Sequence, residues 1–121
     1  MAHILIVEDD PLNMELAVKL VGMKGHDVSE AITGEDALDM VKGSDFDLIL
    51  LDIMLPGIDG LEVLAKLQDD PETAAIPVIA MTAYAMRGDR ERFLNAGCVD
   101  YIAKPIDLDE FWRTLAKYVD E

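Results

Sequence analysis

The chain has 121 residues, 51% of them apolar, and its 25 acidic and 10 basic residues give a formal net charge of −15. This length predicts one compact domain over residues 1–121, and the apolar content is enough to build a core, which excludes a disordered chain. No apolar stretch approaches the roughly 20 residues of a membrane-spanning helix, and the acidity argues against nucleic acid and anionic membranes as partners.

The chain begins with a predicted strand over residues 4–7, followed by a helix. Asp10 is expected to cap this helix, Pro11 occupies its first position, and Gly25 ends it. The residues expected to face the core from this helix are Leu12, Leu16, Leu20 and Met23. These features predict a strand–helix unit at the start of the chain.

The next predicted strand covers residues 27–30 and has the mixed pattern of an edge strand. Its outward-facing positions are expected to be His26, Val28 and Glu30. Thr33 and Asp36 resemble a capping box at the start of the following helix. The third strand, over 48–51, is an unbroken apolar run like the first and the fourth, which predicts burial on both faces.

The second half of the chain repeats the alternation. A helix carries Leu61, Val63, Leu64 and Leu67, and a strand over residues 78–81 follows it. A helix over about 87–96, a strand over 99–103 and a last helix over 108–118 complete the pattern. Strands that alternate with helices are typical of an α/β domain with a parallel sheet.

Reactive side chains follow four of the five predicted strands. Glu8 and Asp9 follow the first, Asp52 the third, Thr82 the fourth and Lys104 the fifth. In doubly wound sheets the carboxyl ends of the strands form the ligand site, so these residues are expected to meet there. A single acid at a strand end is often only a turn former or a helix cap, but that explanation does not account for the whole set.

Three carboxylates at one sheet edge repel one another, and a divalent cation with oxygen ligands relieves this repulsion. Mg²⁺ is the expected ion. It can also neutralise phosphoryl oxygens, for which Lys104 and Thr82 supply donors. Asp52 lies on the central strand and is the expected nucleophile, because carboxylates can form acyl phosphates. The sequence therefore predicts a phosphoryl acceptor site.

Four segments carry a resemblance to the response regulator receiver domains of two-component signalling. They are residues 4–10 (ILIVEDD), 52–60 (DIMLPGIDG), 77–83 (PVIAMTA) and 101–105 (YIAKP). Residues 10–14 (DPLNM) and 86–89 (MRGD) are similar to the stand-alone cell-cycle regulators of the DivK type. The resemblance implies a flavodoxin-like or CheY-like fold, with a doubly wound (βα)5 sheet of strand order 2-1-3-4-5.

The resemblance also implies a role for each site residue. Asp52 is the phosphoacceptor, Asp9 and Asp52 bind Mg²⁺ directly, and Glu8 binds it through water. Glu8 is one methylene longer than the aspartate that is commoner at this position. The Met54 backbone carbonyl is a further expected ligand, and Mn²⁺ can substitute for Mg²⁺. Thr82 and Lys104 are expected to bind the phosphoryl group, Tyr101 to act as a switch residue, and the bond before Pro105 to be cis.

The implied function is that of a signalling phosphoacceptor and not of an enzyme that turns over a substrate. A histidine kinase or a histidine phosphotransfer protein would donate the phosphoryl group to Asp52. Thr82 and Tyr101 would then switch a surface on helix 4, strand 5 and helix 5 that binds a downstream protein target. Self-dephosphorylation is expected to be slow, because an apolar Met54 cannot activate water; Tyr84 is the second position of this kind.

Arg87, Arg90 and Arg92 are three of only ten basic residues and could form part of that target-binding surface. The acids interleaved among them, Asp89 and Glu91, make a set of local ion pairs an equal alternative. We expect a monomer and leave dimerisation on phosphorylation open.

The N-terminus has no basic flank and its apolar run stops at Glu8, which predicts no secretory signal and a cytoplasmic protein. Cys98 is the only cysteine, which fits a reducing compartment.

Three other functions fit parts of the pattern. A phosphatase of the haloacid-dehalogenase type needs a second acid two residues after its nucleophile, and Met54 occupies that position. A flavodoxin-like carrier needs a phosphate-binding loop after the first strand, where the three acids that end at Asp10 would repel phosphate. A receiver-like interaction module that is never phosphorylated is the third alternative, and treatment with a small phosphodonor and Mg²⁺ would distinguish it.

Overall fold

The computed structural model describes residues 2–43, 45–83 and 88–119. Five strands and five helices alternate along these residues, as predicted. The strands are β1 (His3–Val7), β2 (Asp27–Ala31), β3 (Leu48–Asp52), β4 (Val78–Thr82) and β5 (Asp100–Ala103). The helices are α1 (Pro11–Gly22), α2 (Gly34–Val41), α3 (Gly60–Asp69), α4 (Asp89–Ala96) and α5 (Leu108–Ala116).

The strands form one parallel sheet in the order β2-β1-β3-β4-β5. This order confirms the doubly wound α/β prediction, and β2 lies at an edge as expected. All residues of β3 and β4 are buried, because helices cover both faces of the sheet. The register pairs Val7 with Leu51 and Thr82 with Ala103, so the carboxyl ends of the strands end at the same edge.

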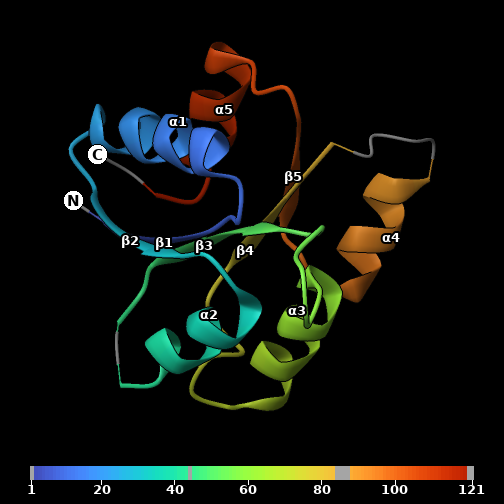
Figure 1. Ribbon diagram of the computed structural model, residues 1–121. Coiled ribbons are helices and arrows are strands. Elements are labelled where there is room, and N and C mark those ends of the chain that lie inside the picture. Colours follow the sequence, from blue (N-terminus) through green and yellow to red (C-terminus); the bar gives the residue numbers. More distant parts are fainter. Residues whose placement is uncertain (1, 44, 84–87, 120–121) are drawn as a thin grey trace.

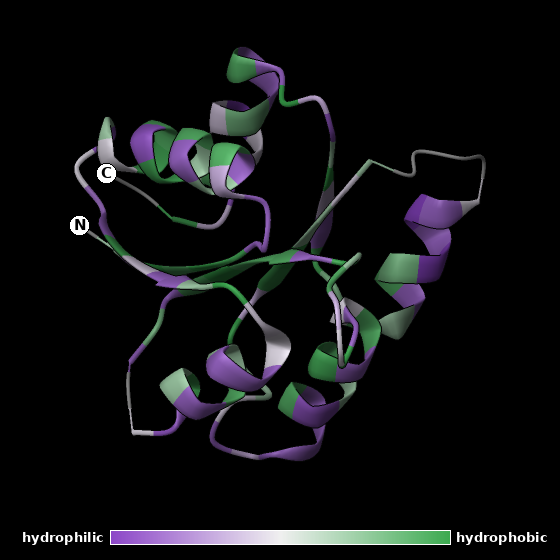
Figure 2. Ribbon diagram, in the orientation of Figure 1, coloured by the Kyte–Doolittle hydropathy of each residue, from purple (hydrophilic) through white to green (hydrophobic). Residues whose placement is uncertain are grey.

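Two layers of helices cover the sheet (Figure 1). Helices α1 and α5 lie on one face, and α2, α3 and α4 lie on the other. Alternate residues of each central strand enter different cores: Ile4 and Ile6 pack toward α1 and α5, whereas Leu5 and Val7 pack toward α2 and α3. Figure 2 shows a largely apolar sheet between helices that carry both hydrophilic and hydrophobic residues.

Side-chain caps fix the start of four helices. The side chains of Asp10, Thr33, Asp59 and Asp107 each accept a hydrogen bond from a backbone N–H in the first turn of the helix that follows. Such caps satisfy N–H groups that have no partner within the helix. The expected caps of the first two helices are confirmed, and the cap of α1 places Asp10 directly after the two acids that follow β1.

The predicted core face of α1 is wrong for three of its four residues. Leu12, Leu16 and Met23 are exposed, and only Leu20 of that set is buried. The buried residues of α1 are Met14, Ala17, Leu20 and Val21. Apolar residues lie nearly all round this helix, so their spacing does not distinguish the face that packs on the sheet.

Smaller differences concern residues near element ends. His26 is buried, not outward-facing, and its Nδ1 accepts a hydrogen bond from the Ala2 N–H at 3.1 Å. Helix α1 ends before the turn at Gly25, α5 ends before residue 118, and β5 begins one residue later than predicted. Tyr84 and Arg87 lie outside the described residues.

None of the helices within the described ranges has the length and apolar character needed to cross a membrane.

Candidate functional site

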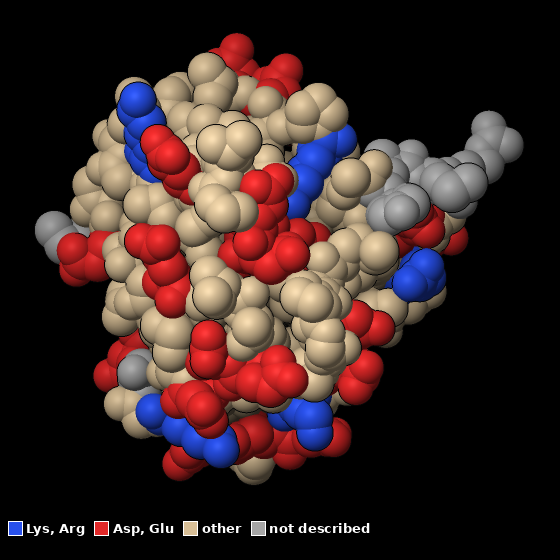
Figure 3. Space-filling model, viewed as in Figure 1, with Lys and Arg blue, Asp and Glu red and all other residues tan. Residues whose placement is uncertain are grey.

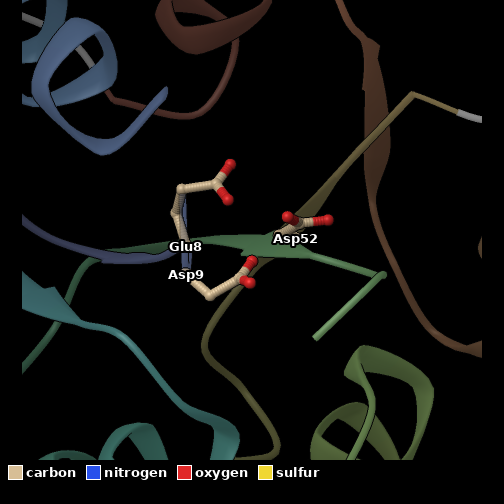
Figure 4. Close-up of side chains that lie close together, drawn as sticks. All are labelled: Glu8, Asp9 and Asp52. Atoms are coloured by element: carbon tan, nitrogen blue, oxygen red, sulfur yellow. The ribbon is translucent and has the colours of Figure 1, made fainter. Parts of the chain in front are cut away.

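The carboxyl ends of four neighbouring strands bring the predicted site residues to one edge of the sheet. Glu8 and Asp9 directly follow β1, Asp52 ends β3, Thr82 ends β4 and Lys104 follows β5. Figure 4 shows Glu8 and Asp9 beside Asp52, with the three carboxyl groups directed toward the same region. Residues that are up to 96 positions apart in the sequence, such as Glu8 and Lys104, are in contact here.

The three carboxylates form a compact cluster. One oxygen from each of Glu8, Asp9 and Asp52 can be chosen so that all three lie within 4.8 Å of one another. Glu8 and Asp52 are 1% and 4% exposed, whereas Asp9 is open to solvent. Carboxylate oxygens are the ligands that Mg²⁺ prefers, and this ion binds through few carboxylates while it keeps several waters. The cluster therefore fits a divalent cation, with Asp9 on the solvent side.

Lys104 places a positive charge against the cluster. Its Nζ donates to Asp52 Oδ2 at 3.1 Å and also contacts Glu8 Oε1. The Lys104 N–H donates to the Thr82 carbonyl at 2.9 Å, which ties the end of β5 to the end of β4. The Lys104–Pro105 peptide bond is cis. The lysine, two of the acids and the end of β4 thus form one connected group.

Backbone N–H groups orient two of the carboxylates. Met54 donates to Asp52 Oδ1 at 2.9 Å, and Asp10 donates to Glu8 Oε2 at 3.1 Å. The Asp10 side chain in turn caps α1 by accepting from the Leu12 N–H at 3.0 Å. The start of α1 therefore holds Glu8 in place, a role for Asp10 that side-chain type alone did not indicate.

Gly60 is a further residue that the site requires. Its N–H donates to the Ile53 carbonyl at 3.0 Å, and a Cβ at this position would lie 2.6 Å from the Asp52 carbonyl oxygen. The sequence motif contained this glycine, but its contact with the backbone of Asp52 was not predicted. Only a residue without a side chain fits here without a shift of the backbone.

Burial and charge change the acidity of the site. Burial raises the pKa of Glu8 to about 7; the nearby Lys104 opposes this rise, and Asp52 adds to it. Burial alone would lower the pKa of Lys104, but its bonds to Glu8 and Asp52 outweigh burial and raise that pKa. Lys104 therefore stays charged, and it offsets part of the repulsion between two buried acids.

Thr82 and Tyr101 lie on neighbouring strands, and Thr82 is fully buried. Tyr101 is partly buried on β5, and its ring centroid lies 5.8 Å from that of Phe93 on α4. Burial raises the pKa of the Tyr101 hydroxyl, with Asp89 and Glu110 adding to the effect. Tyr101 thus faces α4 and stands two residues before the end of its strand.

Outside the cluster, Met54, Arg90 and Arg92 are largely exposed. The Met54 side chain is 54% exposed next to Asp52. Arg92 forms an ion pair with Asp89 at 3.7 Å, as the local-pairing alternative expects, and Arg90 is exposed. Figure 3 shows acidic side chains spread over this face of the molecule, with fewer Lys and Arg residues among them.

The sequence matches the family model of the response regulator receiver domain over residues 4–116. It is 45% identical over 118 residues to the polar-differentiation response regulator DivK of Brucella ovis, which covers 98% of this chain and 96% of that protein. The same figures hold for DivK of Brucella melitensis.

Solved structures have the same fold. The receiver domain of a sensor histidine kinase from Pseudomonas aeruginosa, described as having a magnesium ion coordinated in the active site cleft, has a TM-score of 0.89 and 33% identity. The match covers 99% of this chain and 98% of that one. The chemotaxis response regulator CheY4 of Vibrio cholerae has a TM-score of 0.91 with 21% identity, covering 98% of this chain and 99% of that one. CheY4 therefore supports the fold alone.

Proposed function

The chain belongs to the response regulator receiver domain family, and from this premise we propose that Asp52 accepts a phosphoryl group from a phosphohistidine donor. The family is one of signalling phosphoacceptors and not of enzymes that turn over a substrate. The donor would be a histidine kinase or a histidine phosphotransfer protein, and residues 1–121 would form one receiver domain. The observation that carries this proposal is the acidic cluster at the sheet edge, with Lys104 bonded to Asp52.

The proposed reaction forms one bond and breaks another. A carboxylate oxygen of Asp52 attacks phosphorus, and the bond from phosphorus to the histidine nitrogen breaks, leaving the electron pair on the imidazole. The Met54 N–H holds Asp52 Oδ1 at 2.9 Å, which fixes the orientation of the carboxylate. Lys104 lies within hydrogen-bonding distance of the same carboxylate and can donate to phosphoryl oxygens that arrive beside it.

We propose that Glu8, Asp9, Asp52 and the Met54 backbone carbonyl hold Mg²⁺, with Mn²⁺ as a substitute. Three carboxylates within 4.8 Å of one another support this assignment. When bound, the ion supplies positive charge for the phosphoryl oxygens that are transferred. The resemblance to the family implies that Glu8, which is almost fully buried and bonded to the Asp10 N–H, contacts the ion through water.

Phosphorylation adds negative charge and acceptor oxygens next to Lys104 and Thr82. We propose that Thr82 and Tyr101 pass this change to the surface of α4, β5 and α5, where a downstream protein binds. Tyr101 supports the proposal because its ring lies beside Phe93 of α4. The exposed Met54 side chain carries no group that activates water, so loss of the phosphoryl group is expected to be slow.

Incubation of the protein with acetyl phosphate and MgCl2, followed by intact mass measurement, tests the proposal. We expect the mass of one phosphoryl group to be added, and the adduct to be absent from Asp52→Asn and from samples with excess chelator. Asp59→Asn is the matched control, because Asp59 is an acid that caps α3. An unmodified wild-type protein would instead favour an interaction module that is never phosphorylated.

A further inference from the structure

Met54 presents an exposed thioether side chain two residues after Asp52. It is 54% exposed, and Met23 is 63% exposed. In contrast, Met14 and Met81 are 5% and 1% exposed, and Met40 is partly buried. Tight packing shields a buried thioether from dissolved reagents. Among the methionines that the structure describes, Met23 and Met54 are therefore the ones most open to oxidants.

These two methionines differ in what their sulfur atoms can reach. The Met54 N–H donates to Asp52 Oδ1 at 2.9 Å. Its Cα is one bond further away and thus lies within about 4.4 Å of that oxygen. The sulfur is carried on a flexible, unbranched side chain, so an oxygen atom added to it can approach the Asp52 carboxylate. Met23 follows the last residue of α1, whose 12 residues extend over about 18 Å.

The cysteine of the chain is poorly suited to react with the same oxidants. Cys98 is 5% exposed, and burial raises the pKa of its thiol to about 12. Oxidants react with the thiolate form, which is scarce at neutral pH when the pKa is this high. Oxidation that affects the site is therefore expected to act through Met54 and not through Cys98.

The reaction needs a two-electron oxidant, such as hydrogen peroxide. An electron pair of the thioether sulfur attacks one peroxide oxygen, a sulfur–oxygen bond forms and the oxygen–oxygen bond breaks. The second oxygen leaves as water after proton transfer, so sulfur is oxidised and peroxide is reduced by two electrons. The product is a sulfoxide, which is polar, whereas a thioether is only a weak hydrogen-bond acceptor.

We infer that Met54 is an oxidant-sensitive modification site, and that its sulfoxide shortens the lifetime of a phosphoryl group on Asp52. The inference rests on the proposed function, because it requires a phosphorylated Asp52. The sulfoxide oxygen accepts a hydrogen bond from a water molecule and orients it beside the acyl phosphate. The water oxygen attacks phosphorus, the bond from phosphorus to Asp52 breaks with its electron pair returning to the carboxylate, and a proton passes to solvent. Reduction of the sulfoxide would restore the slow rate.

The selectivity of oxidation is measured on the unphosphorylated wild-type protein. Samples treated briefly with hydrogen peroxide are digested, and peptide mass spectrometry follows each methionine. We expect Met54 and Met23 to be oxidised several-fold faster than Met14 and Met81, because exposure differs so strongly among them. Oxidation of Met54 no faster than that of the two buried methionines would overturn the inference.

The effect on lifetime is measured by comparing each protein with itself before and after oxidation. After treatment with acetyl phosphate and MgCl2 and removal of the donor, intact mass follows loss of the phosphoryl group. Oxidation should accelerate this loss about three- to tenfold in wild type, as one additional hydrogen bond would. Met54→Leu should abolish the acceleration, whereas the matched control Met23→Leu should retain it. An unchanged wild-type rate, or equal acceleration in Met54→Leu, would contradict the inference.

Failure of this inference differs from failure of the proposed function. If Asp52 is phosphorylated but its phosphoryl group is lost equally fast with oxidised and unoxidised Met54, the inference fails and the proposed function stands. If acetyl phosphate leaves Asp52 unmodified in the untreated protein, the proposed function fails and the inference fails with it.

Discussion

Gly60 illustrates how closely the backbone packs behind Asp52. A Cβ here would lie 2.6 Å from both the Asp52 carbonyl oxygen and Ile53 Cα, and neither backbone atom can move independently of the site. Gly60→Ala is therefore expected to lower the free energy of unfolding by about 1–3 kcal/mol, the usual cost of overpacking. Urea unfolding followed by circular dichroism measures this change.

Gly22→Ala is the control for that prediction. Gly22 ends α1, and apart from its chain neighbours and the backbone of its own helix no atom lies within 4 Å of the position that a Cβ would occupy. Alanine should raise stability there by up to about 1 kcal/mol, because it restricts the unfolded chain more than glycine does. If both variants behaved alike, the close approach of Gly60 to Asp52 would not be a constraint on the fold.

At the scale of elements, Asp100 joins the start of β5 to the residues after α5. Its Oδ2 accepts from the Tyr118 hydroxyl at 2.9 Å and from Lys117 Nζ at 3.4 Å, and its Oδ1 accepts from the Tyr101 N–H at 2.9 Å. The Tyr118 hydroxyl also lies 3.0 Å from the Val99 carbonyl. Burial would raise the pKa of Asp100, but these donors outweigh it and lower the pKa below its usual value.

This lowered pKa predicts how stability depends on pH. The folded state favours the ionised form of Asp100, so its contribution is complete above the unfolded pKa near 3.8 and is lost as pH falls through the lower folded value. We expect Asp100→Asn to reduce stability by about 1–2 kcal/mol at neutral pH, and the difference from wild type to shrink below about pH 4. Denaturant unfolding over this pH range measures it, and a difference that is constant with pH would contradict the mechanism.

Helix α4 is attached to the rest of the molecule by very little apolar surface. Phe93 is the one buried residue among its eight, and its ring also packs beside Tyr101. Helix stability in proteins comes mostly from tertiary packing, so α4 should open more readily than its neighbours. Because α4 belongs to the proposed output surface, such weak attachment would suit an element that has to move.

Phe93→Ala tests this attachment. We expect hydrogen exchange of the backbone amides in residues 89–96 to accelerate by at least about tenfold, with little change in α1. Leu94→Ala is the control, since Leu94 is only partly buried on the same helix. If Phe93→Ala accelerated exchange uniformly over the molecule, α4 would be part of the global folding unit and not a separately mobile element.

At the scale of the whole molecule, the fold and the acidic cluster could be predicted because both follow from strand ends. Glu8, Asp52 and Lys104 each stand at the carboxyl end of an apolar run, and the geometry of a parallel sheet brings such ends together. The packed face of α1 could not be predicted, since Leu12 and Leu16 are as apolar as the residues that are buried. Backbone contacts, such as that between the Asp10 N–H and Glu8, depend on local conformation and could not be predicted from residue types.

The net charge of −15 predicts that salt stabilises the folded protein. Self-repulsion among 25 acids destabilises the compact state, so any salt that screens charge should raise the melting temperature. Mg²⁺ should add a specific increment through the acidic cluster, because an ion that binds only the folded state stabilises it, by about 2.7 kcal/mol at 100 times its dissociation constant.

Thermal unfolding in NaCl and in MgCl2 of equal ionic strength separates the two effects. The variant Asp9→Asn removes one exposed carboxylate from the cluster. Asp27→Asn, at an exposed position of the edge strand β2, makes the same change of charge elsewhere. We expect Asp9→Asn to lose most of the increment that is specific to Mg²⁺ and Asp27→Asn to retain it. If both variants kept the increment, Mg²⁺ would stabilise the protein by general screening and not through the cluster.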